Sequence, residues 1–473
     1  MTTSTSATSS SSNLLDVQSL VSQLMAVERQ PIDKLNAKIT TDQTQISSWG
    51  TISGLVSTFQ TAIQSINSGV QGFSAASSNT SAFSATAASN AVPGTYSVSV
   101  SQLAQSQNLV ATGQASDTAA IGNGTATTVT FDFGTISGGT LSSGTYSGAA
   151  FTSNGSGTKS ITIDSTNNTL QGIRDAINAA NMGVTATIVN DGSGTPYRLS
   201  LTSSSTGASN SLKITTSGGD GTINSLLGYD PAGTQNLNQT AAAQNANLTV
   251  NGIAITSSSN SVTNAVQGVT LALSNVTSTP STLTIAHDTS TITSAVSSFV
   301  DAYNALYGQL KSRSSYGSAT TSAGALAGDG TVHTMQDQLR NIFNTPASGG
   351  TMTYLTQIGV SFQTDGTLKL DSTQLNSAMT SNFSDVANLL SSSTGFATRL
   401  DTWATSALQS GDGLIASATS SLNTAITGYN NNINSLEARM TILQAQYTTQ
   451  YSNLNMLLIS MNSTSSYLTA QLA

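Results

Sequence analysis

The sequence contains no cysteine, and only 7% of its 473 residues are charged. A typical globular protein carries about 25% Asp, Glu, Lys and Arg, so charged side chains are sparse here. Without cysteine the chain cannot form a disulfide scaffold, a zinc ribbon, an iron–sulfur cluster or a thiol nucleophile. Its two histidines, His287 and His333, lie far apart in the sequence, so we expect no metal site and no cofactor.

Positive charge, long apolar runs and catalytic motifs are also scarce. The 13 Lys and Arg residues are spread along a chain of net charge −8, which argues against nucleic acid as a partner. No apolar run approaches the roughly 18 residues that span a bilayer, so we expect no membrane insertion. There is no GxSxG nucleophile elbow, P-loop, HExxH motif or EF-hand loop. We therefore expect no enzyme and no catalytic residues.

Ser and Thr fill much of the space that charged residues leave. In residues 1–13 they are accompanied by no charged residue at all. A secretory signal would need a basic start and an apolar stretch, and this segment has neither. The composition predicts a disordered tail, although a non-cleaved export signal of another kind would look the same.

Hydrophobic periodicity predicts long helices at both ends of the chain. Pro31 breaks or restarts a helix between residues 14–27 and a second helix that runs to about residue 67. The clearest repeat lies in residues 413–473, where apolar residues step by three and four and only Gln450 interrupts the run. Heptads sustained this long predict a coiled-coil seam. The predicted assembly seam comprises Leu35, Ile39, Ile46, Trp49, Leu422, Ile426, Ile433, Leu436, Met440, Leu443, Leu454, Leu457 and Met461.

The C-terminal repeat is flanked by Ser, Thr, Asn and Gln rather than by the Glu and Lys of an ordinary coiled coil. Thr and Asn have weak intrinsic helix propensity, so this helix should depend on partner helices for its stability. Two interpretations stay open. The seam also engages other chains, which we favour, or it belongs to one core helix of an isolated bundle.

The middle of the chain has the pattern of short strands. Asn251 and Gly252 stand between two apolar runs, which is a strong hairpin signal, and residues 170–180 predict a short helix. A second hairpin is expected at residues 358–370. Residues 111–158 are so rich in Gly, Ser and Thr that we expect an exposed, variable domain or insertion, with a flexible loop as the alternative for about half of it.

These elements predict an α+β multidomain fold, in which a helical coiled-coil leg from both termini carries a β-rich head. If the two ends pair, they pair antiparallel, with both termini at the far end of the leg. The expected parts are a tail at 1–13, N-terminal leg helices at 14–75, a head at 76–290, helices with a hairpin at 291–412, and the heptad helix at 413–473. The head should comprise two subdomains, with 106–245 the distal one.

Three groups of motifs resemble the bacterial flagellar filament cap family, also called flagellar hook-associated protein 2. The first is at residues 15–32, where the sequence reads LDVQSLV followed by MAVE and PI, and continues in PGTYSV and VSQLAQ at 93–105. The second, at residues 161–203, resembles the hook IN motif of flagellar axial proteins, with Ile177 and Asn178 as its central pair. The third is IGV and DGTL at 358–368, followed by the closing heptad helix.

The resemblance implies a structural protein at the distal tip of the extracellular flagellum. Such proteins leave the cell unfolded through the flagellar type III export channel, without a cleaved signal peptide, and assemble as a ring-like homo-oligomer. Flagellin subunits that emerge from the channel fold and insert beneath the plate formed by the heads. A hook–filament junction protein and an export chaperone are further candidate partners, and some family members act as adhesins, which adds host glycans.

Two alternatives stay open beside the filament cap. A flagellin or a hook–filament junction protein also has helical ends, a β-rich middle and an IN motif. A surface adhesin would need exposed aromatic side chains on the head, where Phe131, Phe133, Tyr146 and Phe151 form the one candidate cluster. A core position is the favoured interpretation for these four residues.

Overall fold

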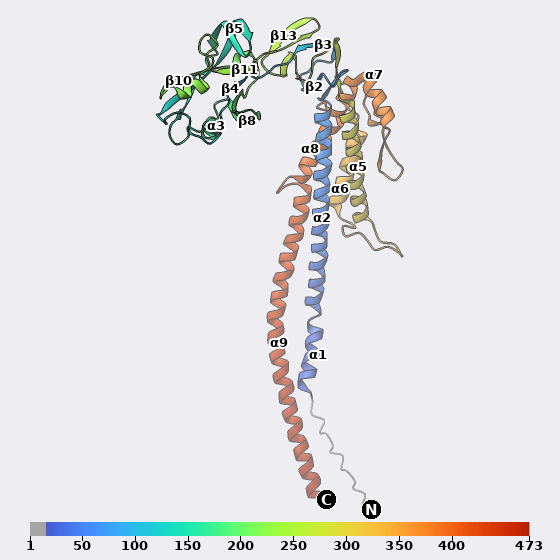
Figure 1. The fold of residues 1–473 in the computed structure, drawn as a ribbon. Coiled ribbons are helices and arrows are strands. Elements are labelled where there is room, and N and C mark those ends of the chain that lie inside the picture. Colours follow the sequence, from blue (N-terminus) through green and yellow to red (C-terminus); the bar gives the residue numbers. More distant parts are fainter. Residues whose placement is uncertain (1–15, 473) are drawn as a thin grey trace, which may run out of the picture. The chain divides into compact units, whose positions relative to one another are not determined.

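Figure 1 shows the computed structural model of the chain, which describes residues 16–472. The expected tail at 1–13 lies outside these residues. The chain divides into two compact units: one joins its two ends, up to Val70 and from Thr289 onward, and the other is Gln71–Asp288. The first unit is mainly helical and the second is built of short strands, so the predicted helical ends and β-rich middle are confirmed.

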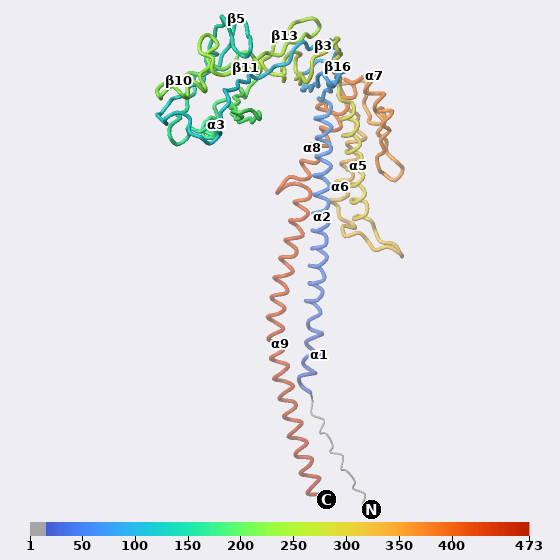
Figure 2. Tube along the Cα trace, in the orientation of Figure 1, coloured from blue at the N-terminus to red at the C-terminus, as the bar shows by residue number. Residues whose placement is uncertain are grey.

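The first unit is formed by helices from both ends of the sequence. Its longest helix, α9, runs alongside α2 and α1 and is antiparallel to them (Figure 2). The antiparallel pairing expected from the heptads is therefore present within a single chain. The helices are α1 (Val17–Glu28), α2 (Gln30–Gly69), α5 (Thr289–Ser314), α6 (Gly330–Asn344), α7 (Ser372–Ser391), α8 (Phe396–Leu408) and α9 (Leu414–Leu472).

The start of α1 and its junction with α2 follow from local sequence. The Asp16 carboxylate accepts a hydrogen bond from the Ser19 N–H at 3.0 Å and caps α1. Arg29 separates the two helices, and Pro31 lies in the first turn of α2, where its missing N–H is not needed. The predicted break at Pro31 is confirmed.

Aromatic side chains dominate the core of the first unit. The Phe59 ring of α2 stacks on Phe299 of α5 at 5.5 Å between centroids, and Tyr303 meets Phe343 of α6 edge-on at 5.2 Å. Trp49 is fully buried in the same core. Rings packed in this way bury large apolar areas, so this core holds α2, α5, α6 and α8 together.

A short hairpin completes the first unit. It comprises the 3-10 turn η2 (Leu355–Ile358) and the strands β17 (Val360–Phe362) and β18 (Leu368–Leu370). Gly366 at its turn has φ of +92°, a backbone conformation that other residues rarely adopt. The hairpin expected at 358–370 is confirmed.

The second unit has two lobes with separate hydrophobic cores. The first lobe is built from residues 73–104 and 246–287, and its core includes Phe83, Val98, Leu248 and Leu271. It contains a five-stranded sheet of order β1-β16-β3-β12-β13 and a three-stranded sheet of order β14-β15-β2. Its strands are β1 (Phe73–Ser77), β2 (Phe83–Ala87), β3 (Gly94–Gln102), β12 (Ala246–Val250), β13 (Ile253–Ser257), β14 (Ser261–Val266), β15 (Val269–Leu273) and β16 (Ser281–His287).

The second lobe spans residues 108–241. Two four-stranded sheets, one of order β11-β4-β9-β8 and one built on β10-β5-β6 with β7 paired to β5, enclose a core with Phe131 and Tyr229. Its elements are β4 (Asn108–Ala111), β5 (Thr127–Ser142), β6 (Thr145–Ser153), β7 (Lys159–Ile163), α3 (Leu170–Ala179), β8 (Val184–Asn190), β9 (Tyr197–Ser203), η1 (Ala208–Asn210), β10 (Ser211–Gly218), α4 (Thr222–Leu227) and β11 (Leu237–Ala241).

The Gly-rich segment 111–158 is more regular than the loop alternative allowed. Residues 127–153 form the hairpin β5–β6, which turns at Ser143 and Gly144, both with positive φ. Val129 and Phe131 point into the core at alternate positions, and this burial fixes the register of the strand. The flexible-loop alternative is therefore wrong for residues 127–153.

The unit boundaries differ slightly from the expected domain limits. The expected boundary between 75 and 76 falls inside β1, because Ala75 and Ala76 pair with Ile285 and Thr284 of β16, more than 200 residues later in the chain. The compact unit accordingly begins at Gln71 and ends at Asp288. A pairing between segments so far apart leaves no local signal in the sequence.

Candidate functional site

The first part of the predicted seam packs within the chain. Ile433 of α9 is 9% exposed, and Leu422 packs against the aromatic core. The Lys38 ammonium of α2 lies 5.5 Å from the centre of the Tyr429 ring of α9, a cation–π contact between the two helices. The other seam residues that are partly buried are Leu35, Ile39, Ile46, Ile426, Leu436, Met440 and Leu443.

Trp49 is buried in the aromatic core, against which the seam residue Leu422 also packs. Trp49 was expected in the seam because it lies seven residues before Val56 in a heptad-like series. In the structure it lies in the aromatic core shared with α5, and its exposed fraction is 0%. A helix in the middle of a bundle has apolar neighbours on several sides, so heptad spacing alone does not identify the partner of each position.

Farther toward the C-terminus, α9 faces α1 across an open groove of about 860 Å³. Val21 and Met25 of α1 line one side, and Met440 and Gln444 of α9 line the other. Val21 is 5% exposed, so the two helices still bury apolar surface here. The packing is less close than in the aromatic core, because a groove of this volume remains between them.

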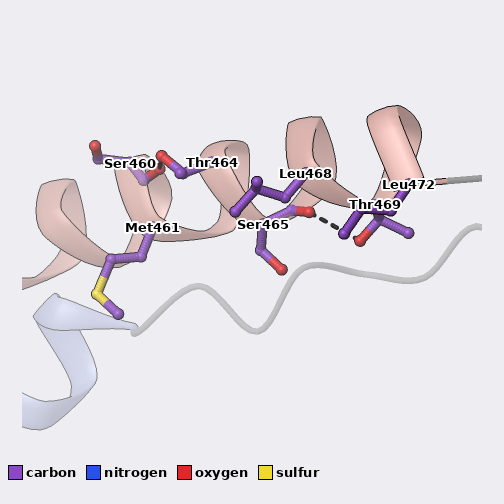
Figure 3. A pocket seen from close by; sticks show the side chains of 7 residues that line it. All are labelled: Ser460, Met461, Thr464, Ser465, Leu468, Thr469 and Leu472. Carbon is purple, nitrogen blue, oxygen red and sulfur yellow. Dashed lines mark hydrogen bonds between the residues drawn. The ribbon is translucent and has the colours of Figure 1, made fainter.

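The last part of the predicted seam is exposed in the single chain. Leu454, Leu457 and Met461 are 41%, 57% and 61% exposed. Figure 3 shows Met461, Leu468 and Leu472 on the final turns of α9, among small Ser and Thr side chains. We call residues 454–472 of α9 the exposed apolar segment. Its other exposed apolar side chains are Met456, Ile459, Tyr467, Leu468 and Leu472.

Sequence reasoning missed these additional residues because the predicted series ended at Met461 and followed only the heptad positions before it. Met456 and Ile459 lie between those positions, so apolar side chains occur on more than one face of the helix. The density of apolar residues after residue 453, rather than their spacing, was the available signal. Contiguous exposed apolar surface of this kind is typical of a protein–protein contact.

The Thr hydroxyl groups along α9, and those of Ser421 and Ser435, are hydrogen-bonded within the helix. The Thr427 hydroxyl donates to the Asn423 carbonyl at 2.9 Å, and Thr448 donates to Gln444 at 2.7 Å. A hydroxyl that is already hydrogen-bonded costs less to remove from water than a free one. The neutral flanks of the seam can therefore be buried against a neighbour at small cost. Further side chains whose hydroxyl donates to the carbonyl four residues earlier are Thr419, Ser421, Thr424, Ser435, Thr441, Thr449, Thr464 and Thr469.

The predicted IN pair lies on α3 in the second lobe. Ile177 is fully buried in the core of the lobe. The Asn178 side chain donates to the Ala186 carbonyl at 2.9 Å and accepts from the Ala186 N–H at 2.8 Å. Ala186 belongs to β8, which is the edge strand of its sheet. Asn178 therefore satisfies the backbone N–H and carbonyl of Ala186, which an edge strand would otherwise leave free to pair with another strand.

The aromatic quartet considered for glycan recognition points largely inward. Phe131 is fully buried, while Phe133, Tyr146 and Phe151 are partly buried. The Tyr146 hydroxyl accepts a hydrogen bond from the Gln239 side chain at 2.9 Å, and the Lys213 ammonium lies 5.8 Å from the centre of the Phe151 ring. These contacts hold the β5–β6 hairpin to the rest of its lobe.

The buried titratable side chains take part in packing and hydrogen bonding within the fold. Burial raises the pKa of the Tyr303 and Tyr229 hydroxyls well above their usual range. The buried Asp385 carboxylate accepts hydrogen bonds from Thr351 and Asn382, beside a kink in α7. Among residues 16–472 no group of three or more His, Cys, Asp or Glu side chains could hold a metal ion. In the same range no helix has both the length and the hydrophobicity of a membrane span.

Comparison with known families supports the resemblance seen in the sequence. The N-terminal model of the flagellar hook-associated protein 2 family matches residues 4–107, and its C-terminal model matches residues 243–463. The flagellin hook IN motif matches residues 150–205. The matches at both ends of the chain are thus with the cap family rather than with flagellin or a junction protein.

Relatives and solved structures agree with these matches. Flagellar hook-associated protein 2 of Escherichia coli O157:H7 is 38% identical, over 97% of this chain and 96% of that protein. The B-type flagellar hook-associated protein 2 of Pseudomonas aeruginosa is 30% identical, over 93% of this chain and 92% of that protein. The crystal structure of the D1-D2-D3 domains of the flagellar cap protein FliD from Escherichia coli matches 80% of this chain and 99% of that chain, with a TM-score of 0.67 and 36% identity. The chain therefore belongs to the flagellar hook-associated protein 2 family, the flagellar filament cap proteins.

Proposed function

We propose that several copies of this chain form a ring-like cap at the distal tip of the flagellar filament, and that flagellin subunits fold and insert beneath it. The observation that carries this proposal is the exposed apolar segment of α9. A single chain leaves Leu457 and Met461 more than half exposed, although both continue the repeat that is buried nearer the core. Such a surface is expected to be covered by helices of neighbouring chains.

The helical ends and the β-rich middle of the chain are proposed to have different roles. Helices α1, α2 and α9 would form the leg that contacts the filament end. The β-rich residues 76–290 would form the head, with 106–245 as its distal part. Because the Thr hydroxyls along α9 are bonded to their own helix, the leg can exchange one neighbour for another at little electrostatic cost as the filament grows.

The predicted seam residues are proposed as the contacts that hold the leg together. Replacing Ile433, Leu436 and Met440 by Ala should loosen α9 from α1 and α2 and abolish tip localisation, because Ile433 is 9% exposed and the other two are partly buried. The aromatic core and the second unit make no use of these residues and should stay folded.

The experiment uses a motile strain from which the gene for this chain has been deleted. The full chain should restore filaments and keep flagellin out of the medium, whereas the triple Ala variant should release flagellin monomers. Electron microscopy of the filament tips reports the cap directly. Normal filaments and caps with the variant would show that the leg seam is not the anchor, and failure of the unaltered chain to restore filaments would contradict the capping function itself.

The remaining partners are proposed from the family resemblance. An export chaperone and the hook–filament junction protein would both bind the chain outside the assembled cap, and co-purification from deletion strains tests each of them. Binding of host glycans lacks an exposed aromatic platform at Phe131, Phe133, Tyr146 and Phe151, and a glycan array with the full chain tests it. Export through the flagellar channel without a cleaved signal peptide is tested by sequencing the N-terminus of the secreted chain.

A further inference from the structure

A cleft of about 450 Å³ lies in the first unit between α5, α6 and the turn of the β17–β18 hairpin. Its volume falls within the range of about 300–1,000 Å³ that is usual for ligand sites. The cleft lies away from the heptad seam, and two residues of the DGTL motif, Asp365 and Gly366, line it.

The turn that forms one wall of the cleft is held by one face of α5. Tyr303, Tyr307 and Lys311 are spaced four residues apart, so they lie one above the other on the helix. The Tyr303 hydroxyl donates to the Gly366 carbonyl at 3.4 Å, and the Lys311 ammonium donates to the Asp365 carbonyl at 3.0 Å. A site on a wall fixed in this way is formed before a ligand arrives.

The polar side chains of the cleft have free hydrogen-bonding capacity. Gln336, Asn344 and Gln363 line it, and none of their amide groups bonds to another side chain or to the backbone within residues 16–472. Each primary amide offers both N–H donors and a carbonyl acceptor, the same two functions that a peptide unit presents. The Arg340 guanidinium uses one N–H on Asp337, at 3.1 Å, and has further donors available.

The apolar part of the cleft suits an aliphatic side chain better than a sugar ring. Tyr303 is only 4% exposed and stacks on Tyr307 at 5.8 Å between centroids, with an interplanar angle of 11°. Lys311 lies 5.8 Å from the centre of the Tyr307 ring and Gly366 is in close contact with that ring, so its faces are occupied. A sugar needs an open aromatic face on which to stack. Phe362, at 46% exposed, offers an apolar contact on the rim instead.

We propose that this cleft binds an extended stretch of unfolded polypeptide. The main-chain amides of that stretch pair with Gln336, Asn344 and Gln363, and one of its apolar side chains packs against Phe362. The identity of the occupant as a filament subunit that has not yet folded rests on the proposed function. The cleft then holds an exported subunit briefly before it inserts.

Binding is tested with the full chain in solution by calorimetry, without filaments. The probe is a hexapeptide of alternating glycine and leucine with acetylated and amidated ends. We expect saturable binding of one peptide per chain. An analogue with ester bonds in place of alternate amides, which lacks those N–H donors, should bind about five- to tenfold more weakly.

Two variants locate the binding in the cleft. Gln363→Ala should weaken it about fivefold, since one neutral hydrogen bond is removed. Phe362→Ala should weaken it at least tenfold. The matched control is Tyr316→Ala, an aromatic residue of the same unit that is 72% exposed and does not line the cleft, and it should bind as the unaltered chain does.

Thermal unfolding checks that the variants are folded. Phe362→Ala removes edge-on ring contacts with Tyr303 and Phe343, so Gln363→Ala, whose side chain makes no such contact, is the decisive variant. Equal affinity of Gln363→Ala and the unaltered chain would overturn the proposal. So would binding of maltohexaose in place of the peptide. Loss of peptide binding with normal filament growth would overturn the role of the cleft in assembly and leave the capping function intact.

Discussion

The exposed apolar segment gives the most specific prediction for assembly. Replacing Leu454, Leu457 and Met461 together by Ala removes apolar surface that a single chain leaves open to solvent. The variant should therefore fold as the unaltered chain does and fail to join a cap. A matched triple of exposed polar residues on the other side of the same stretch of helix, Asn462→Ala, Ser463→Ala and Ser466→Ala, should leave both folding and assembly unchanged.

The size of the effect follows from the exposed fractions of 41%, 57% and 61%. Complete burial of a Leu or Met side chain contributes about 1.5–3 kcal/mol, so burial of the exposed half contributes about 1 kcal/mol. The three residues together amount to about 3 kcal/mol per chain, or roughly a 150-fold change in an association constant. In the isolated chain about half of each side chain is already exposed to solvent, so we expect a change in unfolding free energy below about 1 kcal/mol.

Two measurements separate folding from assembly. Thermal unfolding of the purified variant reports the single chain, and flagellin released into the medium of a complemented deletion strain reports the cap. The expected result is unchanged unfolding with released flagellin. The reasoning would be refuted by a variant that assembles normally, and equally by one that unfolds several degrees earlier, since the segment would then be packed within the chain.

Three further predictions concern the second unit. Asn178→Ala should lower its unfolding free energy by about 1–3 kcal/mol, because both hydrogen bonds to Ala186 are lost, and amide exchange in β8 should accelerate. Gln107→Leu should lower the unfolding free energy by a similar amount, because the buried Gln107 side chain donates to Gln239 of β11 and accepts from the Leu212 N–H of β10. Denaturant unfolding measures this loss. Hydrogen bonding to Arg198 and to Ser193 lowers the pKa of Asp191 to about 2, so this contribution to stability is present above the ordinary Asp pKa and is lost as the pH falls toward 2. An NMR titration of the Arg198→Met variant should show the Asp191 pKa raised part of the way toward its usual range, because the hydrogen bonds from Ser193 remain.

Short-range patterns predicted much of the fold. The Asn251–Gly252 signal gave a two-residue turn in which both residues have positive φ, as type I′ geometry requires. The apolar spacing at residues 170–180 gave α3, which the Thr169 hydroxyl caps through the Gly172 N–H at 3.0 Å. In each case the residues that determine the structure lie within a few positions of one another.

Features that depend on contacts between distant residues could not be predicted from sequence patterns. The pairing of β1 with β16 joins segments more than 200 residues apart, and no periodicity encodes it. The heptads gave α9 and its antiparallel partner, but they did not separate the buried Ile433 from the exposed Met461. That difference depends on where α1 and α2 lie beside the helix, which is set by the tertiary packing of the unit.

The part of the account most open to direct test is the contact between the exposed apolar segment and neighbouring chains. The absence of cysteine allows a single Met461→Cys substitution to be labelled with a benzophenone photo-crosslinker at that one site. Irradiation of filaments capped by the labelled chain should give adducts with neighbouring chains, and the monomer in solution should give none. A label that reacts only within its own chain, or not at all in assembled caps, would contradict the account.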